Sequence, residues 1–165
     1  MALTELPLNL PGRLYRCPMP FSEFDRAGLL IDLFTLNEIS LVVVLAEAQE
    51  CLDVARCDLI GLYRSRSLDV IHLPMRDYTA GRGEPIRPYV RRVLKELRVG
   101  RHVAVHCRAG MGRTGMFAAC LAREVLGLSG NEAIVWIRRL VPGAVETRGQ
   151  EDLVRAYLGR DAPGP

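Results

Sequence analysis

The sequence lacks the closely spaced cysteine pairs that bind zinc or build a disulfide framework. Its five cysteines are odd in number and widely spaced, and no two of them are separated by only two residues. Structural zinc sites use such C-x2-C pairs, and small disulfide-stapled domains use even sets of cysteines. We therefore expect free thiols and a reducing compartment.

Long apolar runs are also lacking. The longest uninterrupted run, Leu41–Ala46, is far shorter than the roughly 18–20 residues that a membrane span needs. The first residues show no charged segment followed by an apolar block, which is the pattern of a secretory signal. These absences predict a cytoplasmic protein without stable membrane association.

The sequence also lacks a large excess of charge of either sign. The formal net charge is only +3, which does not favour nucleic acid as a partner. With 165 residues, 49% of them hydrophobic, the chain can build one ordinary globular core. We expect a single domain over residues 1–165, with residues 1–12 as an N-terminal arm and residues 160–165 as a frayed tail.

Strand-like patterns recur at intervals along the chain. Strands are predicted at residues 13–17, 40–46, 68–73 and 102–106, the first of them at a sheet edge. The second is apolar throughout, as is typical of the middle of a parallel sheet. Residues 74–88 contain two glycines and predict a long loop, and such loops are usually functional.

Helical patterns separate these strands. Helices are predicted at 27–36, at 47–66, around 90–97, from Thr114 to Leu126, from the capping box at Ser129–Glu132 to Pro142, and over 150–158. The alternation of strands and helices predicts an α/β fold with a central, mostly parallel sheet of four or five strands flanked by helices.

The chemistry-bearing stretch is the turn after the last predicted strand. Residues 106–115 have the sequence H-C-R-A-G-M-G-R-T-G and open a helix. Backbone N–H groups and the positive helix end make such a turn an anion site, and Arg113 can bind two phosphate oxygens at once. The same dipoles would favour a thiolate at Cys107, which makes it a nucleophile directed at a bound phosphorus.

A nucleotide-binding loop, G-x-x-x-x-G-K-[ST], fits this stretch poorly, because Cys107 falls on its first glycine and Arg113 on its lysine. The order C-x5-R-T, with a preceding histidine and glycines at 110, 112 and 115, resembles the H-C-x-x-G-x-x-R-[ST]-G loop of cysteine-dependent protein tyrosine and dual-specificity phosphatases, in particular their compact archaeal and mitotic-exit types. The resemblance implies that the loop binds the phosphoryl group of the substrate through Arg108, Ala109, Gly110, Met111, Gly112 and Arg113.

A thiolate phosphatase also needs a general acid for the leaving oxygen. Asp77 follows the predicted strand at 68–73, so its loop should meet the Cys107 loop at the carboxyl edge of the sheet. The family acid lies at a comparable distance upstream, which supports Asp77. The D-x-x-x-P pattern of related sequences is absent, and Glu84 is the rival acid, with Asp77 preferred.

Further roles follow from the resemblance. P-G-A-x-E-T-x-x-Q, which ends at Gln150, resembles the segment that supplies a water-positioning glutamine in the mitotic-exit and archaeal types. The alternative for Gln150 is a helix-opening surface residue. Thr114 is implied to stabilise the leaving thiolate. His106 is expected to shape the loop through backbone hydrogen bonds, and His72 and His102 to be structural.

The resemblance implies a two-step reaction through a phosphocysteine on Cys107, with no metal and no organic cofactor. The expected partner is a phosphorylated protein or peptide. Phosphotyrosine is the expected substrate, with phosphoserine and phosphothreonine also accepted, because the recognition loop that deepens the pocket of tyrosine-only enzymes is not found. A phosphate-recognition module without turnover is the non-enzyme alternative, and the presence of both Cys107 and Arg113 disfavours it.

Two further hypotheses stay open. A phosphoinositide phosphatase is the second substrate class, because Arg108 matches one of the two basic loop positions of such enzymes while Met111 does not match the other. Basic residues near the acid loop help this hypothesis slightly, although a solvated helix face is the preferred interpretation: Arg82, Arg87, Arg91 and Arg92. Cys51 or Cys57 could protect Cys107 as a disulfide, although a role as small core residues is favoured.

Overall fold

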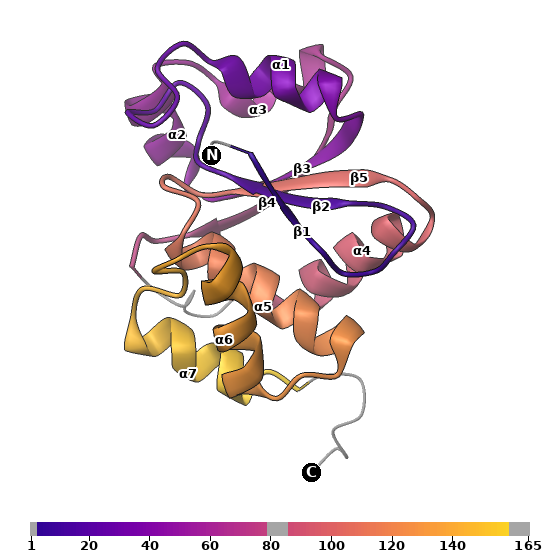
Figure 1. Ribbon diagram of the computed structural model, residues 1–165. Coiled ribbons are helices and arrows are strands. Elements are labelled where there is room, and N and C mark those ends of the chain that lie inside the picture. Colours follow the sequence, from indigo (N-terminus) through magenta and orange to yellow (C-terminus); the bar gives the residue numbers. More distant parts are fainter. Residues whose placement is uncertain (1–2, 79–85, 159–165) are drawn as a thin grey trace.

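The computed structural model describes residues 3–78 and 86–158, and it contains a five-stranded sheet between two layers of helices (Figure 1). The strand order is β1-β2-β5-β3-β4. The strands are β1 (Thr4–Leu6), β2 (Leu14–Cys17), β3 (Ile39–Ala46), β4 (Asp69–Met75) and β5 (His102–His106). Only β1 pairs in the antiparallel sense, so the predicted mostly parallel α/β sheet is confirmed, with five strands.

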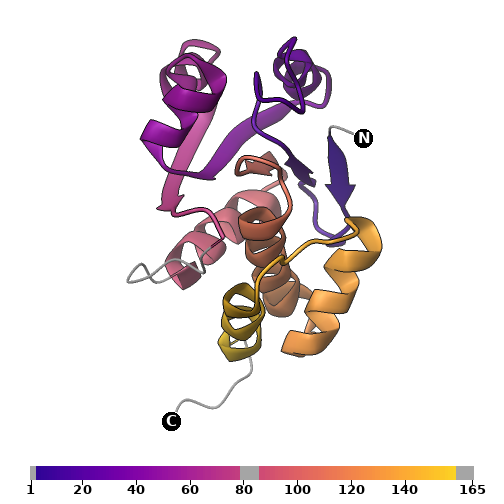
Figure 2. The same cartoon turned by 90° about the vertical axis from the view of Figure 1, so that its left-hand side faces the viewer.

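The helices cover both faces of the sheet (Figures 1 and 2). One layer holds α1 (Leu29–Leu36), α2 (Ala48–Ala55) and α3 (Leu59–Ser65). The other holds α4 (Ile86–Arg98), α5 (Gly112–Leu126), α6 (Gly130–Leu140) and α7 (Arg148–Ala156). Each layer of helices packs on the sheet through a cluster of buried apolar side chains. Side chains of the buried strand β3 alternate between the two clusters, with Val43 on the α5 side and Val44 on the α1 side.

The N-terminal segment departs from the prediction. Residues 1–12 were expected to form a surface arm, but Thr4–Leu6 pairs with β2 as an antiparallel edge strand, and Leu6 and Leu8 are buried in the core. The prediction that residues 13–17 lie at a sheet edge is therefore wrong, since β2 lies between β1 and β5. Three residues are too short a run to show strand periodicity.

The predicted helix over 47–66 is two helices. The chain breaks at Arg56, whose φ of 58° is left-handed, and Asp58 then caps α3 by accepting a hydrogen bond from the Gly61 amide. Arginine carries no sequence signal for a left-handed backbone, so the break could not be placed in advance.

The strand predicted to end before Pro74 also extends further. Strand β4 continues through Pro74 to Met75, which is possible because β4 lies at the sheet edge, where a missing N–H need not cost a ladder bond. Helix α4 begins at Ile86, inside the stretch expected to be loop, and Pro88 lies in its first turn, where proline is tolerated.

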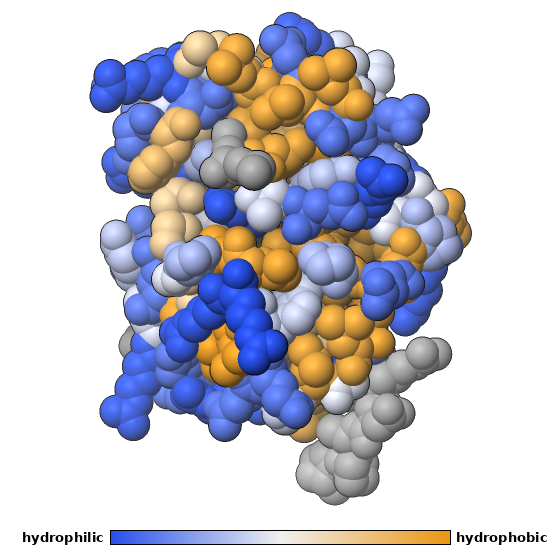
Figure 3. Space-filling model, viewed as in Figure 1, coloured by the Kyte–Doolittle hydropathy of each residue, from blue (hydrophilic) through white to orange (hydrophobic). Residues whose placement is uncertain are grey.

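Helix α5 is the buried helix predicted from the apolar residues around most of its circumference, Met116–Ala122. It begins at Gly112, two residues before the expected start at Thr114, and almost every side chain along it is buried. Helix α6 opens with the predicted capping box between Ser129 and Glu132. No helix among the described residues is long and apolar enough to cross a membrane. Apolar surface gathers over α1, where Leu29 and Leu36 are exposed (Figure 3).

Candidate active site

Four parallel strands end at the same edge of the sheet, and the segment after each one contributes to a single site. Glu23 and Phe24 follow β2, Glu50 follows β3, Asp77 follows β4, and Cys107 follows β5 directly. Ligand sites of α/β proteins form outside the carboxyl ends of parallel strands. The topology therefore explains why residues far apart in the sequence meet here.

The loop from Cys107 to Arg113 is held against the segment that follows β2. The Met19 amide donates a 2.8 Å hydrogen bond to the carbonyl of Arg108. Gly110 has φ +72°, and a Cβ there would lie 2.3 Å from the carbonyl oxygen of Cys17. Both the backbone angle and the space admit only glycine at position 110.

Arg113 lies in the first turn of α5, and its side chain is fully buried. Its Nη1 and Nη2 atoms donate to the two Glu50 carboxylate oxygens at 2.7 and 2.8 Å, and Nη1 also donates to the Met75 carbonyl at 2.8 Å. Nη2 lies 3.0 Å from Oδ1 of Asp77. Burial acts to lower the pKa of Arg113, but the Glu50 hydrogen bonds and the negative charges of Cys107, Glu50 and Asp77 raise it above its usual value.

Two buried polar atoms in the first turn of α5 have no hydrogen-bond partner among the described residues. They are Nε of Arg113 and Oγ1 of Thr114. Buried polar groups in folded proteins are nearly always paired, so such an exception requires an explanation. A bound anion at the helix start would supply an acceptor for the guanidinium, which points to an anion site at this place.

A cavity of about 260 Å³ opens at this edge. Its lining includes Cys107, which is only 3% exposed, and the loop residues Arg108 and Ala109. Asp77 also lines the cavity, and it forms the ion pair with Arg113. The remaining lining residues were not singled out from the sequence, and they are Glu23, Phe24, Tyr78 and Glu146.

The exposed loop cation is neutralised. Nε and Nη2 of Arg108 both donate to Oε1 of Glu23, at 3.1 and 2.8 Å. The pKa of Glu23 is lowered by a backbone hydrogen bond and by the Arg108 hydrogen bond. Arg108 therefore reaches the cavity with a carboxylate already beside it.

His106 holds the start of the Cys107 loop through a hydrogen bond from its ring. It is fully buried, and because a carbonyl can only accept, its Nδ1 donates to the Cys107 carbonyl at 3.0 Å. The Tyr63 hydroxyl then donates to Nε2 at 2.8 Å. Burial lowers the pKa of His106 to about 4, so the ring is neutral at pH 7. The expected loop-shaping role agrees with this geometry.

The other two histidines also have structural contacts. Nε2 of His72 lies 2.9 Å from the Ala46 carbonyl, at the irregularity between β3 and β4. Nδ1 of His102 accepts from the Arg13 amide at 3.1 Å, where β2 begins. Both contacts join neighbouring strands, as expected for structural residues.

Gln150 lies beside the loop but not in the cavity lining. It is fully buried, and its Oε1 accepts from the amides of Glu146 and Thr147 at 2.9 and 3.3 Å, in a capping box that opens α7. A Cβ on Gly112 would lie 3.0 Å from Nε2 of Gln150 and 2.3 Å from Oε2 of Glu146. The surface alternative for Gln150 is thus wrong, although the residue does open a helix.

Several residues that the sequence analysis named lie away from the cavity lining or outside the described residues. Arg87 and Arg91 face Glu124 of α5 at 3.8 Å, so they are already engaged there. Glu84 and Arg82 lie outside the described residues, as does the predicted tail. All five cysteines are free thiols. Burial and the Glu50 charge raise the pKa of Cys51 to about 11, which leaves it protonated at neutral pH and disfavours it as a protecting thiol.

Sequence reasoning missed Glu50 as well as the lining residues Glu23, Phe24, Tyr78 and Glu146. Glu50 follows a predicted parallel strand, so its place at the carboxyl edge was a usable signal. Glu146 lies inside the segment that was singled out for its glutamine. No group of His, Cys, Asp or Glu within the described ranges is arranged to hold a metal ion.

Comparison with known proteins identifies the family of this chain. A family model described as "PTP-SAK: Swiss Army Knife protein, DSP-PTPase phosphatase domain" matches residues 28–154. The protein tyrosine phosphatase domain-containing protein 1 of Mus musculus is 41% identical over 61 residues, which is 37% of this chain and 8% of that protein. The tyrosine-protein phosphatase cdc-14 of Caenorhabditis elegans is 49% identical over 43 residues, 26% of this chain and 6% of that protein. The matches thus span less than a tenth of these relatives' length.

Solved structures show the same fold. Tk-PTP in its active form has a TM-score of 0.75 and 29% identity, over 92% of this chain and 94% of that one. Kinase associated phosphatase, with its catalytic site cysteine replaced by serine, has a TM-score of 0.82 and 22% identity, over 92% and 90% of the two chains. The family match covers most of the chain, and the chain belongs to the dual-specificity-type protein tyrosine phosphatase (DSP-PTPase) domain family.

Proposed function

We propose that this chain is a protein phosphatase that hydrolyses phosphotyrosine, and phosphoserine or phosphothreonine as well, through a phosphocysteine on Cys107. One observation carries the proposal. Cys107 and Asp77 line one cavity, Asp77 forms an ion pair with the fully buried Arg113, and the Nε of Arg113 has no partner among the described residues. A phosphoryl group is the anion that this set of a nucleophile, an acid and a planar cation is suited to bind.

In the first step the Cys107 thiolate attacks phosphorus in line, and a P–S bond forms as the bond from phosphorus to the leaving oxygen breaks. Asp77 gives its proton to that oxygen. Arg113 holds the equatorial oxygens of the transition state, and this electrostatic stabilisation supplies a large share of the barrier reduction.

In the second step water attacks the phosphocysteine. Asp77 takes a proton from the water, orthophosphate is released, and the Cys107 thiolate is restored. The buried Thr114 hydroxyl, one residue beyond Arg113, is proposed to stabilise that thiolate as it leaves. Gln150, which lies against Gly112, is proposed to orient the water. Neither step uses a metal or an organic cofactor.

Asp77 and Arg113 form an ion pair for which a bound phosphoryl group would compete. Their 3.0 Å contact occupies one guanidinium nitrogen that a phosphoryl group would use. A bound phosphoryl group would compete for Nη2 and release the carboxyl group to turn toward the leaving oxygen. Since Asp77 is 40% exposed on a segment at the cavity rim, such a turn requires little repacking.

Two aromatic side chains favour phosphotyrosine among the phosphorylated residues. Phe24 and Tyr78 line the cavity and are 55% and 65% exposed, which is unusual for large apolar side chains. Aromatic rings stack on one another at a gain of roughly 0.5–1.5 kcal/mol per pair. A phosphotyrosine ring could contact both walls while its phosphate reaches the loop.

A phosphoinositide is the second candidate substrate, because Arg108 is a cation at the cavity. A structural neighbour, PTPMT1, was solved in complex with PI(5)P, although at 17% identity it shows the fold alone. Here Glu23 already pairs with Arg108, and Glu146 and Asp77 add negative charge to the lining. This acidic rim disfavours a headgroup with several phosphates.

The test is the rate of phosphate release without metal, from p-nitrophenyl phosphate, from phosphotyrosine, phosphoserine and phosphothreonine peptides, and from soluble phosphoinositides. Wild type is compared with Cys107→Ser and Asp77→Asn. We expect no turnover for Cys107→Ser, a loss of about 10²- to 10⁴-fold on peptides for Asp77→Asn, and the highest kcat/KM on phosphotyrosine.

A wild type that binds phosphopeptide yet turns over none of these substrates would replace the enzyme by a phosphate-recognition module. A higher kcat/KM on the phosphoinositides would move the substrate class to lipid headgroups. Full activity in Cys107→Ser would remove the phosphocysteine from the mechanism.

A further inference from the structure

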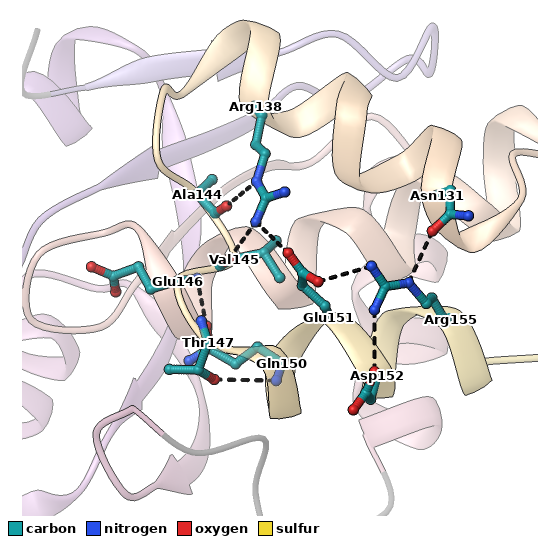
Figure 4. A network of polar contacts seen from close by, with 10 residues as sticks. All are labelled: Asn131, Arg138, Ala144, Val145, Glu146, Thr147, Gln150, Glu151, Asp152 and Arg155. Atoms are coloured by element: carbon teal, nitrogen blue, oxygen red, sulfur yellow. Dashed lines mark hydrogen bonds and ion pairs between the residues drawn. The ribbon is translucent and has the colours of Figure 1, made fainter.

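The segment between α6 and α7 is fixed by one arginine. Nε of Arg138 donates to the Ala144 carbonyl at 2.9 Å, and its Nη2 donates to the Val145 carbonyl at 2.8 Å. Nη2 also donates to Oε1 of Glu151 at 2.7 Å, which ties the contact to α7 (Figure 4). A single side chain from α6 thus joins two successive carbonyls to the next helix.

The backbone at this point is strained. Val145 is fully buried and has φ 59°, a conformation that β-branched residues rarely adopt. Such a conformation costs on the order of 1–3 kcal/mol and persists only where the surroundings impose it. The two hydrogen bonds from Arg138 fall on the carbonyl of Val145 and on the carbonyl before it, so they are part of what imposes it.

The strained segment lies against the loop that holds Cys107. The Val145 amide reaches the Met111 carbonyl at 3.4 Å, and a Cβ on Gly115 would lie 2.8 Å from Cβ of Ala144. Just beyond it, Glu146 lines the cavity and Gln150 lies against Gly112. The position of these two side chains therefore depends on how the segment is held.

We propose that Arg138 is a positioning residue for the hydrolysis of the phosphocysteine. It holds residues 144–147 so that Gln150 and Glu146 lie beside the loop. This inference rests on the proposed function. The first step needs Asp77 and Arg113, which contact each other. Arg113 also contacts Glu50 and the Met75 carbonyl at the end of β4, rather than this segment. Loosening the segment should therefore slow the second step more than the first.

The chain offers a matched control in Arg155. Arg155 donates to the other carboxylate oxygen of Glu151 at 2.8 Å, and also to Asp152 and Asn131 (Figure 4). It belongs to the same charge network, but among the described residues its side chain donates to these three groups and to no carbonyl of residues 144–147. Arg138→Met and Arg155→Met each remove one cation from Glu151, and only the first frees the two carbonyls.

The experiment is rapid mixing of each variant with p-nitrophenyl phosphate. For Arg138→Met we expect a burst approaching one p-nitrophenol per enzyme, followed by a steady-state rate about 10- to 100-fold below wild type, because a small misplacement of a catalytic group can cost that much. Arg155→Met should match wild type in both the burst amplitude and the steady-state rate. Arg138→Lys keeps a charge for Glu151 but cannot fork to two carbonyls, and it should behave like Arg138→Met.

Amide hydrogen exchange provides a readout that needs no turnover. In Arg138→Met the amides of Val145 and Glu146 should exchange faster than in wild type, and in Arg155→Met they should not. Unchanged exchange, or a rate loss without a burst, would overturn the role of Arg138. An inert wild type would instead overturn the proposed function, with the exchange result still deciding whether Arg138 holds the segment.

Discussion

At the scale of single residues, the site depends on a buried charge that is compensated by another residue. The Arg113 guanidinium is fully buried, and Glu50, whose side chain is 16% exposed, meets it with both carboxylate oxygens. Removing one partner of a buried pair leaves an uncompensated charge, at a cost of about 3–5 kcal/mol. The pair also fixes the guanidinium plane, and with it the direction in which Nε points.

Glu50→Gln should therefore reduce both stability and activity. We expect a loss of about 3 kcal/mol in the free energy of unfolding, together with a fall in kcat of about 100-fold as the guanidinium loses its fixed plane. Urea denaturation and steady-state rates measure the two effects. Glu47→Gln, which removes an exposed charge just before the same helix, is the control and should change neither. A Glu50→Gln variant with wild-type kcat would show that Arg113 is oriented without this pair.

The residues that could be predicted are those with chemistry in their own local pattern. Cys107 and Arg113 lie in one short glycine-rich stretch, and Asp77 follows a recognisable strand. Glu50 and Glu23 are ordinary acidic residues in their local sequence. Their roles arise only when α2 and the segment after β2 are brought to the carboxyl edge of the sheet, which is a tertiary event.

At the scale of elements, the strongest periodic signals predicted the fold. The apolar strand β3, the striped helix α4 and the buried helix α5 all appear where the pattern indicates. The sequence did not predict the short strand β1 or the break between α2 and α3 at the left-handed Arg56, because neither has a local sequence signal. Pairing with β2 and burial of Leu6 stabilise β1 more than its own propensity does.

Helices α6 and α7 both begin with a capping box, but only the box of α7 includes a residue beside the candidate site. Ser129 and Glu132 form the capping box of α6, and Thr147 and Gln150 form that of α7. Each box satisfies two backbone amides that would otherwise lack partners. Only the second box contains a residue that lies against the Cys107 loop, so the cap and the site share Gln150.

Ser129→Ala and Thr147→Ala should thus have similar effects on stability and different effects on catalysis. Each should cost about 1 kcal/mol in the free energy of unfolding through loss of the cap. Only Thr147→Ala should slow turnover, by up to about tenfold, the factor that corresponds to 1.4 kcal/mol. Denaturant midpoints and steady-state rates on p-nitrophenyl phosphate provide the comparison. Equal rates in the two variants would separate the α7 cap from the site.

At the scale of the whole molecule, one buried residue joins the layers. His106 belongs to β5, its ring meets Tyr63 of α3, and its Nδ1 holds the carbonyl of Cys107. Protonation would give the ring a second N–H, at Nε2, which in the neutral ring accepts from the Tyr63 hydroxyl, and it would bury a charge. Burial lowers the pKa of His106 from 6.5 to about 4 for this reason. Global stability is therefore linked to pH through this ring.

The sign of the linkage follows from the direction of the shift. Between pH 6.5 and about 4 the unfolded chain binds a proton at His106 that the folded chain does not, so stability falls as the pH falls. The contribution is fully present above pH 6.5 and amounts to about 3 kcal/mol, at roughly 1.4 kcal/mol per pKa unit. Urea denaturation at pH 7.5, 5.5 and 4.0 should show this loss.

The control for this measurement must remove the titration and keep the contact. In His106→Asn the side-chain amide can still donate to the Cys107 carbonyl, but it does not titrate. This variant should be less stable than wild type at pH 7.5, because Tyr63 loses its acceptor, and its stability should fall less steeply between pH 6.5 and 4. Acidic groups elsewhere titrate equally in both proteins, so the difference in slope isolates His106. Parallel pH profiles would mean that the folded protein accommodates a protonated His106, and the support under the Cys107 loop would then not depend on a neutral ring.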